Sequence, residues 1–255
     1  MNSSTDLTGQ VALITGASSG LGEHFAQVLS ACGAKVAIVA RRLDKLHALQ
    51  TKITDAGGHA FAVEMDVSSE VSVESALTAI QEELGNVSIL VNNAGMAESR
   101  SFLKMDEQNW RKTMDVNLDG AWRVAHRVSQ QMVATGTKGS IVNTASILGL
   151  RQGFGHTAYA VSKAGIIQMT KSMALELASK GVRVNALCPG YIETEINADY
   201  FATDAGREYV KTTTAGRVGR LDELDGPLLM LCSEAGSFVN GVALAVDGGH
   251  LVGGL

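Results

Sequence analysis

The stretch Gln10-Val-Ala-Leu-Ile-Thr-Gly-Ala-Ser-Ser-Gly-Leu-Gly22 decides the fold of this 255-residue chain. Residues 10–15 form a short apolar run, which is typical of a buried strand. A glycine-rich turn follows, and a helical apolar pattern begins at Phe25. This order predicts a phosphate site, because glycines admit a pyrophosphate close to the backbone and a helix N-terminus favours its charge. The GxxxGxG spacing differs from the general GxGxxG fingerprint, so the turn by itself is a weak signal.

Apolar runs and helical patterns continue to alternate along the chain. The runs predict further strands at residues 35–40, 59–64, 87–91, 139–145, 182–187 and 241–246. Helical spacing predicts helices at residues 44–56, 71–84, 107–135, 156–179 and 222–233. Alternating strands and helices imply right-handed crossovers and a parallel sheet with helices on both faces. No linker or repeat interrupts the pattern, so we expect one α/β domain over residues 1–255, with a doubly wound parallel sheet of about seven strands.

Composition and charge restrict the class of protein. Hydrophobic residues make up 45% and charged residues 18% of the chain, as in folded globular proteins. The net charge of -5, without a Lys/Arg cluster, argues against a nucleic-acid partner. The polar first residues and the lack of a long apolar run argue against a secretion signal and a membrane span. Cys32, Cys188 and Cys232 lack metal-ligand spacing, so we expect no metal site and a reduced, cytoplasmic setting.

A tyrosine and a lysine lie four residues apart in the predicted helix 156–179. Tyr159 and Lys163 should therefore project from the same face of that helix. A neighbouring ammonium favours the phenolate, so we expect Lys163 to lower the pKa of Tyr159 and make it a general acid or base near neutral pH. An ordinary solvated helix face would show the same YxxxK pattern.

Polar residues and glycines gather where the predicted strands end. The ligand of a doubly wound sheet lies outside the carboxyl ends of its strands, so these residues should converge on one crevice. The residues concerned are Gly16 to Gly22, Arg41-Arg42, Asp66-Val67, Asn92-Asn-Ala-Gly95, Ser146 and Pro189-Gly190-Tyr-Ile-Glu-Thr194. Taken singly, each also fits a structural role, such as a turn serine or an asparagine that satisfies backbone groups.

Together, these motifs resemble the short-chain dehydrogenase/reductase family in their order and spacing, over nearly the whole chain. The resemblance rests on Thr15-Gly-Ala-Ser-Ser-Gly-Leu-Gly22, Asn92-Asn-Ala-Gly95, Asn117, Ser146, Tyr159xxxLys163 and Pro189-Gly190xxxThr194. It implies a Rossmann-type fold, a nicotinamide cofactor, and hydride transfer that interconverts a carbonyl (ketone) and a secondary alcohol. It also implies a homotetramer, or at least a homodimer, built on the helices within residues 107–135 and 156–179.

The same resemblance implies catalytic roles for Asn117, Ser146, Tyr159 and Lys163. Tyr159 would exchange a proton with the substrate oxygen, while Lys163 would lower its pKa and bind the nicotinamide ribose. Ser146 would orient the substrate oxygen, and Asn117 would hold a water in a proton relay through Lys163. The implied cofactor-binding residues are Gly16, Ser18, Ser19, Gly20, Leu21, Gly22, Arg41, Arg42, Asp66, Val67, Asn93, Ala94, Gly95, Tyr159, Lys163, Pro189, Gly190, Ile192 and Thr194.

The predicted strand 35–40 ends at Arg41 and Arg42, where an acidic residue would accept the ribose hydroxyls of NAD. Guanidinium groups match phosphate geometry, so the two arginines favour NADP(H) over NAD(H). Ser19 is neutral where some NADP-preferring relatives carry a basic residue, so the preference depends on the arginines. Surface arginines at a helix start would give the same pattern, which leaves an NAD(H)-dependent alcohol or sugar-alcohol dehydrogenase open.

The substrate wall should come from the loops 96–101, 147–155 and 191–214, of which the last is expected to form a lid. An apolar pocket is predicted from Ile147, Leu148, Leu150, Phe154, Tyr191 and Phe201. His156 could face the substrate, but a histidine in solvent at a helix start is the favoured interpretation. A 3-oxoacyl reductase, a sugar-alcohol dehydrogenase and a broad ketone reductase all stay open. A dinucleotide-binding regulator without turnover would be expected to lack Tyr159 or Lys163, and both are present.

Overall fold

One parallel sheet of seven strands forms the centre of the computed structural model, which describes residues 3–194, 198–211 and 213–253. The strands are β1 (Val11–Thr15), β2 (Lys35–Ala40), β3 (His59–Glu64), β4 (Ile89–Asn92), β5 (Gly139–Thr144), β6 (Val182–Pro189) and β7 (Ala243–Val246). Their order in the sheet is β3-β2-β1-β4-β5-β6-β7, and all the pairings are parallel. The doubly wound sheet predicted from the sequence is therefore confirmed.

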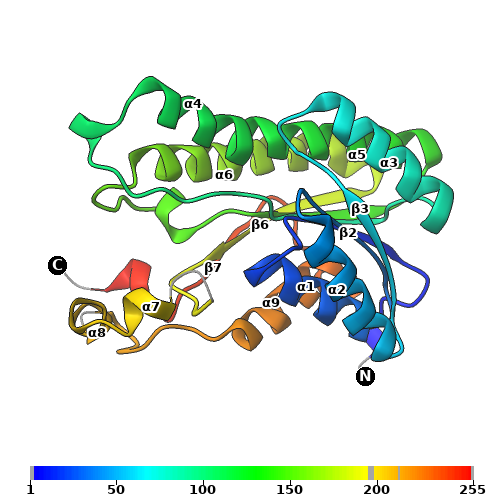
Figure 1. The fold of residues 1–255 in the computed structure, drawn as a ribbon. Helices are drawn as coiled ribbons and strands as arrows, with labels where there is room; N and C mark the ends of the chain where they lie inside the picture. Colours follow the sequence, from blue (N-terminus) through cyan, green and yellow to red (C-terminus); the bar gives the residue numbers. More distant parts are fainter. Residues whose placement is uncertain (1–2, 195–197, 212, 254–255) are drawn as a thin grey trace.

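Helices cover both faces of this sheet (Figure 1). On one face lie α3 (Glu70–Leu84), α4 (Glu107–Met114), α5 (Gly120–Thr135) and α6 (Thr157–Leu177). On the other lie α1 (Gly20–Ala31), α2 (Leu43–Asp55) and α9 (Asp225–Cys232). The two short helices α7 (Ala198–Phe201) and α8 (Asp204–Lys211) lie beyond the sheet edge, on the side where the described chain ends. No helix within the described ranges is long and apolar enough to cross a membrane.

The central strand β1 shows how the two cores form. All five of its residues are buried, as expected for a strand with helices on both sides. Successive side chains point to opposite faces, so Ile14 packs with Phe25 of α1 while Leu13 packs with Val124 of α5. Each crossover helix thus covers its own face of the sheet, and the strand ends stay open at the carboxyl edge.

The predicted helix 107–135 contains a π-helical turn at Asp115–Asp119, which separates α4 from α5. Gly120 follows the turn at a close approach to Val67, in the segment after β3. A Cβ at Gly120 would lie 2.8 Å from Val67 Cγ2, so any larger residue here would have to displace the Val67 side chain. Single π turns inside helices often mark functional sites, and this turn carries the buried Asn117.

Candidate active site

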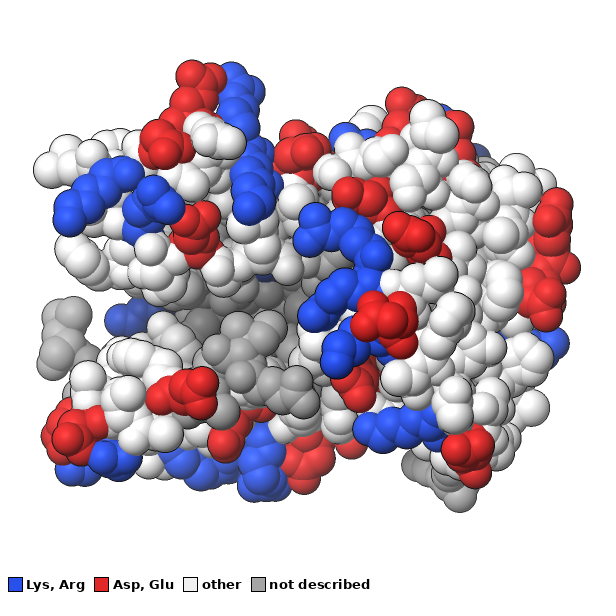
Figure 2. Space-filling view, in the orientation of Figure 1, with Lys and Arg blue, Asp and Glu red and all other residues white. Residues whose placement is uncertain are grey.

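The carboxyl ends of β1, β4, β5 and β6 open into a cavity of about 580 Å³. It is lined by the predicted site residues Gly16, Ser19, Gly20, Leu21, Asn93, Gly95, Ser146, Tyr159, Lys163, Pro189, Gly190, Ile192 and Thr194. Its lining also includes Met96, Ala97, Thr144, Ala145, Ile147, Leu148, His156 and Tyr191. The predicted residues Ser18, Gly22, Arg41, Arg42, Asp66, Val67, Ala94 and Asn117 are not part of this lining. Lys and Arg side chains stand beside the hollow on the face shown in Figure 2.

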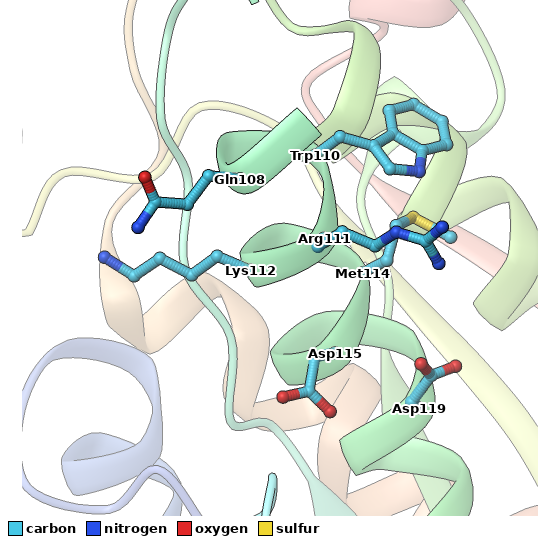
Figure 3. Close-up of a pocket in the computed structure, with 7 residues that line it drawn as sticks. All are labelled: Gln108, Trp110, Arg111, Lys112, Met114, Asp115 and Asp119. Carbon is cyan, nitrogen blue, oxygen red and sulfur yellow. The ribbon is translucent and has the colours of Figure 1, made fainter. Parts of the chain in front are cut away.

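Another hollow, of about 670 Å³, lies on the outer side of α4 and the π turn (Figure 3). It is lined by Gln108, Trp110, Arg111, Lys112, Met114, Asp115 and Asp119. These side chains leave the helix in different directions, and Gln108 and Lys112 point away from Trp110. None of the predicted site residues lines this hollow, so the smaller cavity at the strand ends is the candidate site.

The glycine turn after β1 brings its backbone very close to neighbouring atoms. A Cβ at Gly22 would lie 2.3 Å from Gly16 O, and a Cβ at Gly16 would lie 2.8 Å from Ala94 Cα. Gly16 and Gly20 also adopt positive φ angles of 66° and 57°. Because α1 begins at Gly20, its first backbone N–H groups face this turn, which is the arrangement that holds a phosphate. The residues therefore fit a dinucleotide.

The segment after β4 is tied to β1 by hydrogen bonds. Asn93 N and Ala94 N both donate to Thr15 Oγ1, over 2.9 and 2.8 Å, and Asn93 Nδ2 donates to Thr15 O over 3.0 Å. Asn92 turns into the protein, where its Nδ2 donates to Ala121 O over 2.7 Å. These asparagines therefore hold two strand ends together and fix the floor of the cavity.

The two arginines after β2 take different positions. Arg42 reaches the glycine turn, where its Nη2 donates to Ser18 Oγ and to Ser19 Oγ, each over 2.8 Å. Arg41 is exposed and lies near Asp66. Burial acts to raise the pKa of Asp66, but hydrogen bonds from Ser68 and the charges of Arg41 and Arg123 outweigh it and lower that pKa. Only Arg42 is thus held directly against the turn.

Tyr159 and Lys163 both line the cavity from the same face of α6, as their spacing predicts. Lys163 Nζ lies 5.6 Å from the centre of the Tyr159 ring and donates to Thr144 O over 2.7 Å. Tyr159 shares a hydrogen bond with the Ser146 side chain, and Ser146 Oγ accepts a bond of 3.1 Å from Leu148 N. The sequence reasoning did not identify Thr144, because a backbone carbonyl that binds a lysine has no sequence signature.

The pKa of Tyr159 shifts opposite to the sequence-based prediction. Burial raises it, and the hydrogen bond with Ser146 opposes this only in part. Burial also lowers the pKa of Lys163 to about 8. The prediction that Lys163 lowers the tyrosine pKa is therefore wrong for the protein by itself. The reason is that burial is the largest influence on both groups, and Tyr191 raises the pKa of Tyr159 further.

Asn117 lies in the π turn, buried behind the cavity. Its Nδ2 donates to Met96 O over 2.9 Å and to Ser162 Oγ over 3.1 Å, and its Oδ1 accepts from Met96 N over 2.8 Å. A Cβ at Gly95 would lie 3.4 Å from Asn117 Oδ1 and 3.6 Å from Lys163 Nζ. Gly95 therefore leaves a narrow space between the asparagine amide and the lysine.

His156 does not lie in solvent, as the sequence interpretation favoured. It is half-buried and lines the cavity, and its Nδ1 is sealed from solvent without a hydrogen-bond partner among the described residues. Two predicted pocket residues are also corrected, since Phe154 is 94% exposed and Leu150 44% exposed, and neither lines the cavity. The fold turns these two side chains outward, and apolar character alone could not show this.

The predicted lid, residues 191–214, contains α7 and α8; residues 195–197 and 212 lie outside the described ranges. Tyr191, a cavity residue, forms its centre. Its ring lies 6.1 Å from that of Phe201, 5.3 Å from that of Tyr209 and 5.5 Å from that of His250. Phe201 therefore supports the cavity wall through Tyr191 and does not line the cavity itself.

No group of three or more His, Cys, Asp or Glu side chains within residues 3–194, 198–211 and 213–253 is arranged to hold a metal ion. The polar groups of the candidate site lie in two sets. They comprise a phenol, a serine hydroxyl and an ammonium at one end of the cavity and a phosphate-type turn at the other.

Comparison with known proteins shows sequence similarity over nearly the full length of this chain. A family model described as short chain dehydrogenase matches residues 10–205. The 3-oxoacyl-[acyl-carrier-protein] reductase FabG of Aquifex aeolicus is 35% identical over 244 residues, which cover 95% of this chain and 98% of the relative. The L-rhamnose 1-dehydrogenase (NAD(P)(+)) of Sphingomonas sp. is 38% identical over 248 residues, which cover 96% and 98%.

Solved structures show the same architecture. A gluconate 5-dehydrogenase from Burkholderia cenocepacia, in complex with NADP and tartrate, superposes with a TM-score of 0.93 at 36% identity and covers 98% of each chain. Levodione reductase superposes with a TM-score of 0.92 at 30% identity, covering 96% of this chain and 99% of that one. Both likenesses include the strand ends and loops that form the cavity, because almost the entire chain is matched.

Proposed function

The chain belongs to the short chain dehydrogenase family of enzymes that act on CH–OH groups, and from this premise we propose that it interconverts ketones and secondary alcohols with NADP(H). One observation carries the proposal. Ser146, Tyr159 and Lys163 line one cavity together with the glycine turn, so the proton-transfer groups and the phosphate-type turn share a single space.

The cofactor supplies the hydride when NADPH is bound. The glycine turn and the first N–H groups of α1 would hold its pyrophosphate, with Arg42 placed against Ser18 and Ser19 for the 2′-phosphate. Tyr159 would donate its proton to the substrate oxygen as negative charge develops there. Ser146 would donate a second hydrogen bond to the same oxygen and so stabilise that charge.

The protonation of Tyr159 favours the reductive direction in this proposal. Because burial raises the pKa of Tyr159, the hydroxyl keeps its proton at neutral pH and is ready to act as an acid toward a carbonyl oxygen. Alcohol oxidation needs the phenolate as a base, so this direction must first remove that proton. In the bound complex, a positive nicotinamide ring beside the phenol would lower this cost.

Asn117 and Lys163 would return a proton to the Tyr159 phenolate through a proton relay. Both hydrogens of the Asn117 amide are already donated, to Met96 O and Ser162 Oγ, whereas Oδ1 accepts only one bond, from Met96 N. An amide oxygen has two lone pairs, so one stays able to accept from a water. The gap above Gly95 would place that water between Oδ1 and Lys163 Nζ.

The preference for NADP(H) over NAD(H) rests mainly on Arg42, with Arg41 beside it. Solved relatives support the cofactor class, since the gluconate 5-dehydrogenase contains NADP. The other proposed cofactor contacts come from residues at or after the ends of β3 and β6. Asp66 and Val67 would contact the adenine. The nicotinamide would be contacted by Pro189, Gly190, Ile192 and Thr194.

The complete chain would act as one catalytic domain with a lid at residues 191–214, assembled as a homotetramer or homodimer. Exposed apolar side chains on the outer helices support this assembly, including Trp122 of α5 and Leu175 of α6. Light scattering is the test: a single species at the chain mass of 26.7 kDa would reject any oligomer.

The test of the function is a screen of ketones with NADPH and of secondary alcohols with NADP, followed at the nicotinamide absorbance. We expect turnover in both directions and a higher kcat/KM with the phosphorylated cofactor. Tight NADPH binding with no turnover of any carbonyl would instead favour a regulator without catalytic activity.

A further inference from the structure

His156 gives the cavity a polar side chain that the proposed hydride chemistry does not use. It lies at the N-cap of α6, three residues before Tyr159, and its carbonyl already accepts a hydrogen bond of 2.7 Å from Ala160 N. Side chains three residues apart on a helix are neighbours, with Cβ atoms about 5–6 Å apart. Both side chains line the same cavity, so a substrate that reacts at Tyr159 would share the space that His156 lines.

The surroundings of His156 determine what its ring can offer. Its Cδ2 edge faces Gly153, where an added Cβ would lie 3.4 Å from that atom and 3.0 Å from Leu148 Cδ2. Nδ1 is sealed and unpartnered, whereas Nε2 is not among the sealed polar atoms of the described residues. An N–H at Nδ1 would lack an acceptor, so the neutral ring favours its proton on Nε2. The imidazole then offers Nε2–H as a donor.

The other lining residues restrict what that donor would bind. The cavity lining includes the apolar residues Met96, Ala97, Ile147 and Leu148, and Leu148 lies beside the His156 ring across Gly153. Lys163 is the one Lys or Arg among the lining residues that the structure describes, and the proposed function already assigns it to the proton relay, so no further cation of the lining is left for a carboxylate. A neutral hydroxyl is the partner that a single neutral donor in an apolar wall suits best.

We propose that His156 is a specificity-determining residue that binds a hydroxyl on the carbon next to the reacting carbonyl. The substrate class is then the α-hydroxy ketone, and the product is a vicinal diol. Hydride adds to the carbonyl carbon, Tyr159 gives its proton to the carbonyl oxygen, and NADPH becomes NADP⁺. The neighbouring hydroxyl is unchanged and serves only for binding. This inference rests on the proposed function.

The first test needs only the unmodified protein and two ketones of matched size. The protein is expected to reduce 2-hydroxycyclohexanone with a kcat/KM about tenfold or more above that for 2-methylcyclohexanone, because a methyl group leaves the His156 donor unpaired. Equal values for the two ketones would overturn the inference but leave the proposed function intact. No reduction of either ketone, nor of any other in the screen, would count against the proposed function.

The second test assigns the preference to His156. The ratio to compare is kcat/KM for 2-hydroxycyclohexanone divided by kcat/KM for 2-methylcyclohexanone. In His156→Leu this ratio should fall at least fivefold, mainly through a higher KM for the hydroxy ketone. In His156→Gln, which keeps a hydrogen-bond donor, the ratio should fall less. The matched control is His59→Leu, which changes an exposed histidine at the start of β3, away from the cavity, and should leave the ratio unchanged. A ratio that is unchanged in both His156 variants would overturn the assignment. Because the ratio compares two substrates on one protein, a loss of folded material does not alter it.

Discussion

The two ends of the cavity are built differently. At the proposed cofactor end, backbone atoms approach each other closely, and hydrogen bonds join Thr15 to Asn93 and Arg42 to the turn serines. At the proposed substrate end, side chains from separate loops line the cavity, and Tyr191 packs against the rings of Phe201 and Tyr209. The first region is fixed by steric limits at Gly16 and Gly22, where an added Cβ would overlap backbone atoms. The second depends on packing, so its residues can change without loss of the fold.

The proposed catalytic groups Ser146, Tyr159 and Lys163 line the same cavity, and the largest expected effect tests their role. Tyr159→Phe removes the proton donor but keeps the ring, so turnover should fall by about 10²- to 10⁴-fold. NADPH affinity, measured by fluorescence titration, should stay within a few fold. Near-normal turnover would mean that Tyr159 has no catalytic role. Loss of NADPH binding would mean that the Tyr159 hydroxyl acts mainly in binding the cofactor.

A second prediction sharpens the description of the cofactor end. Arg42→Ala should weaken NADPH binding by about ten- to a hundredfold, because charge-assisted hydrogen bonds contribute about 1.5–3 kcal/mol. Arg41→Ala is the matched control and should have the smaller effect, since only Arg42 is held by Ser18 and Ser19. Titrations with NADPH and NADH on both variants measure the difference. A larger loss in Arg41→Ala would reverse the assignment.

The pH dependence probes the catalytic groups themselves. Lys163 is protonated below its pKa of about 8, so its charge is present at neutral pH and is lost as the pH rises through that value. The rate of ketone reduction should therefore fall several fold between about pH 7 and 9, whereas alcohol oxidation should rise because it needs the Tyr159 phenolate. Steady-state rates in both directions provide the measurement. Lys171→Ala, which changes an exposed lysine on α6, should leave both profiles in place.

The smallest effect is expected at the outer surface of the substrate end. Phe154 projects into solvent and does not line the cavity, so Phe154→Ser should change kcat/KM for any small ketone by no more than about twofold. A tenfold change would show that the loop 147–155 folds over the substrate during turnover. The assignment of Phe154 to the outer surface, and not to the cavity wall, would then be incorrect.

Local sequence alone determined the features that depend on neighbours along the chain. The spacing of Tyr159 and Lys163 fixes their common helix face, and the glycines from Gly16 to Gly22 predict a tight turn wherever the strand ends. Alternating apolar runs likewise determine a parallel sheet, because buried strands and amphipathic crossovers leave few other arrangements. These properties arise from steric limits and periodicity, which act over a few residues.

Tertiary structure alone decided the features that depend on contacts between distant segments. Burial among residues from β5, β6 and the loop after β4 sets the pKa directions of Tyr159 and Lys163, against the prediction from their mutual charge. Which of two adjacent arginines reaches the glycine turn depends on how β2 ends beside β1. The same holds for His156, which the loop at Gly153 holds against the cavity, and for Phe154, which it exposes. Desolvation and packing are properties of the assembled surroundings, so no short stretch of sequence specifies them.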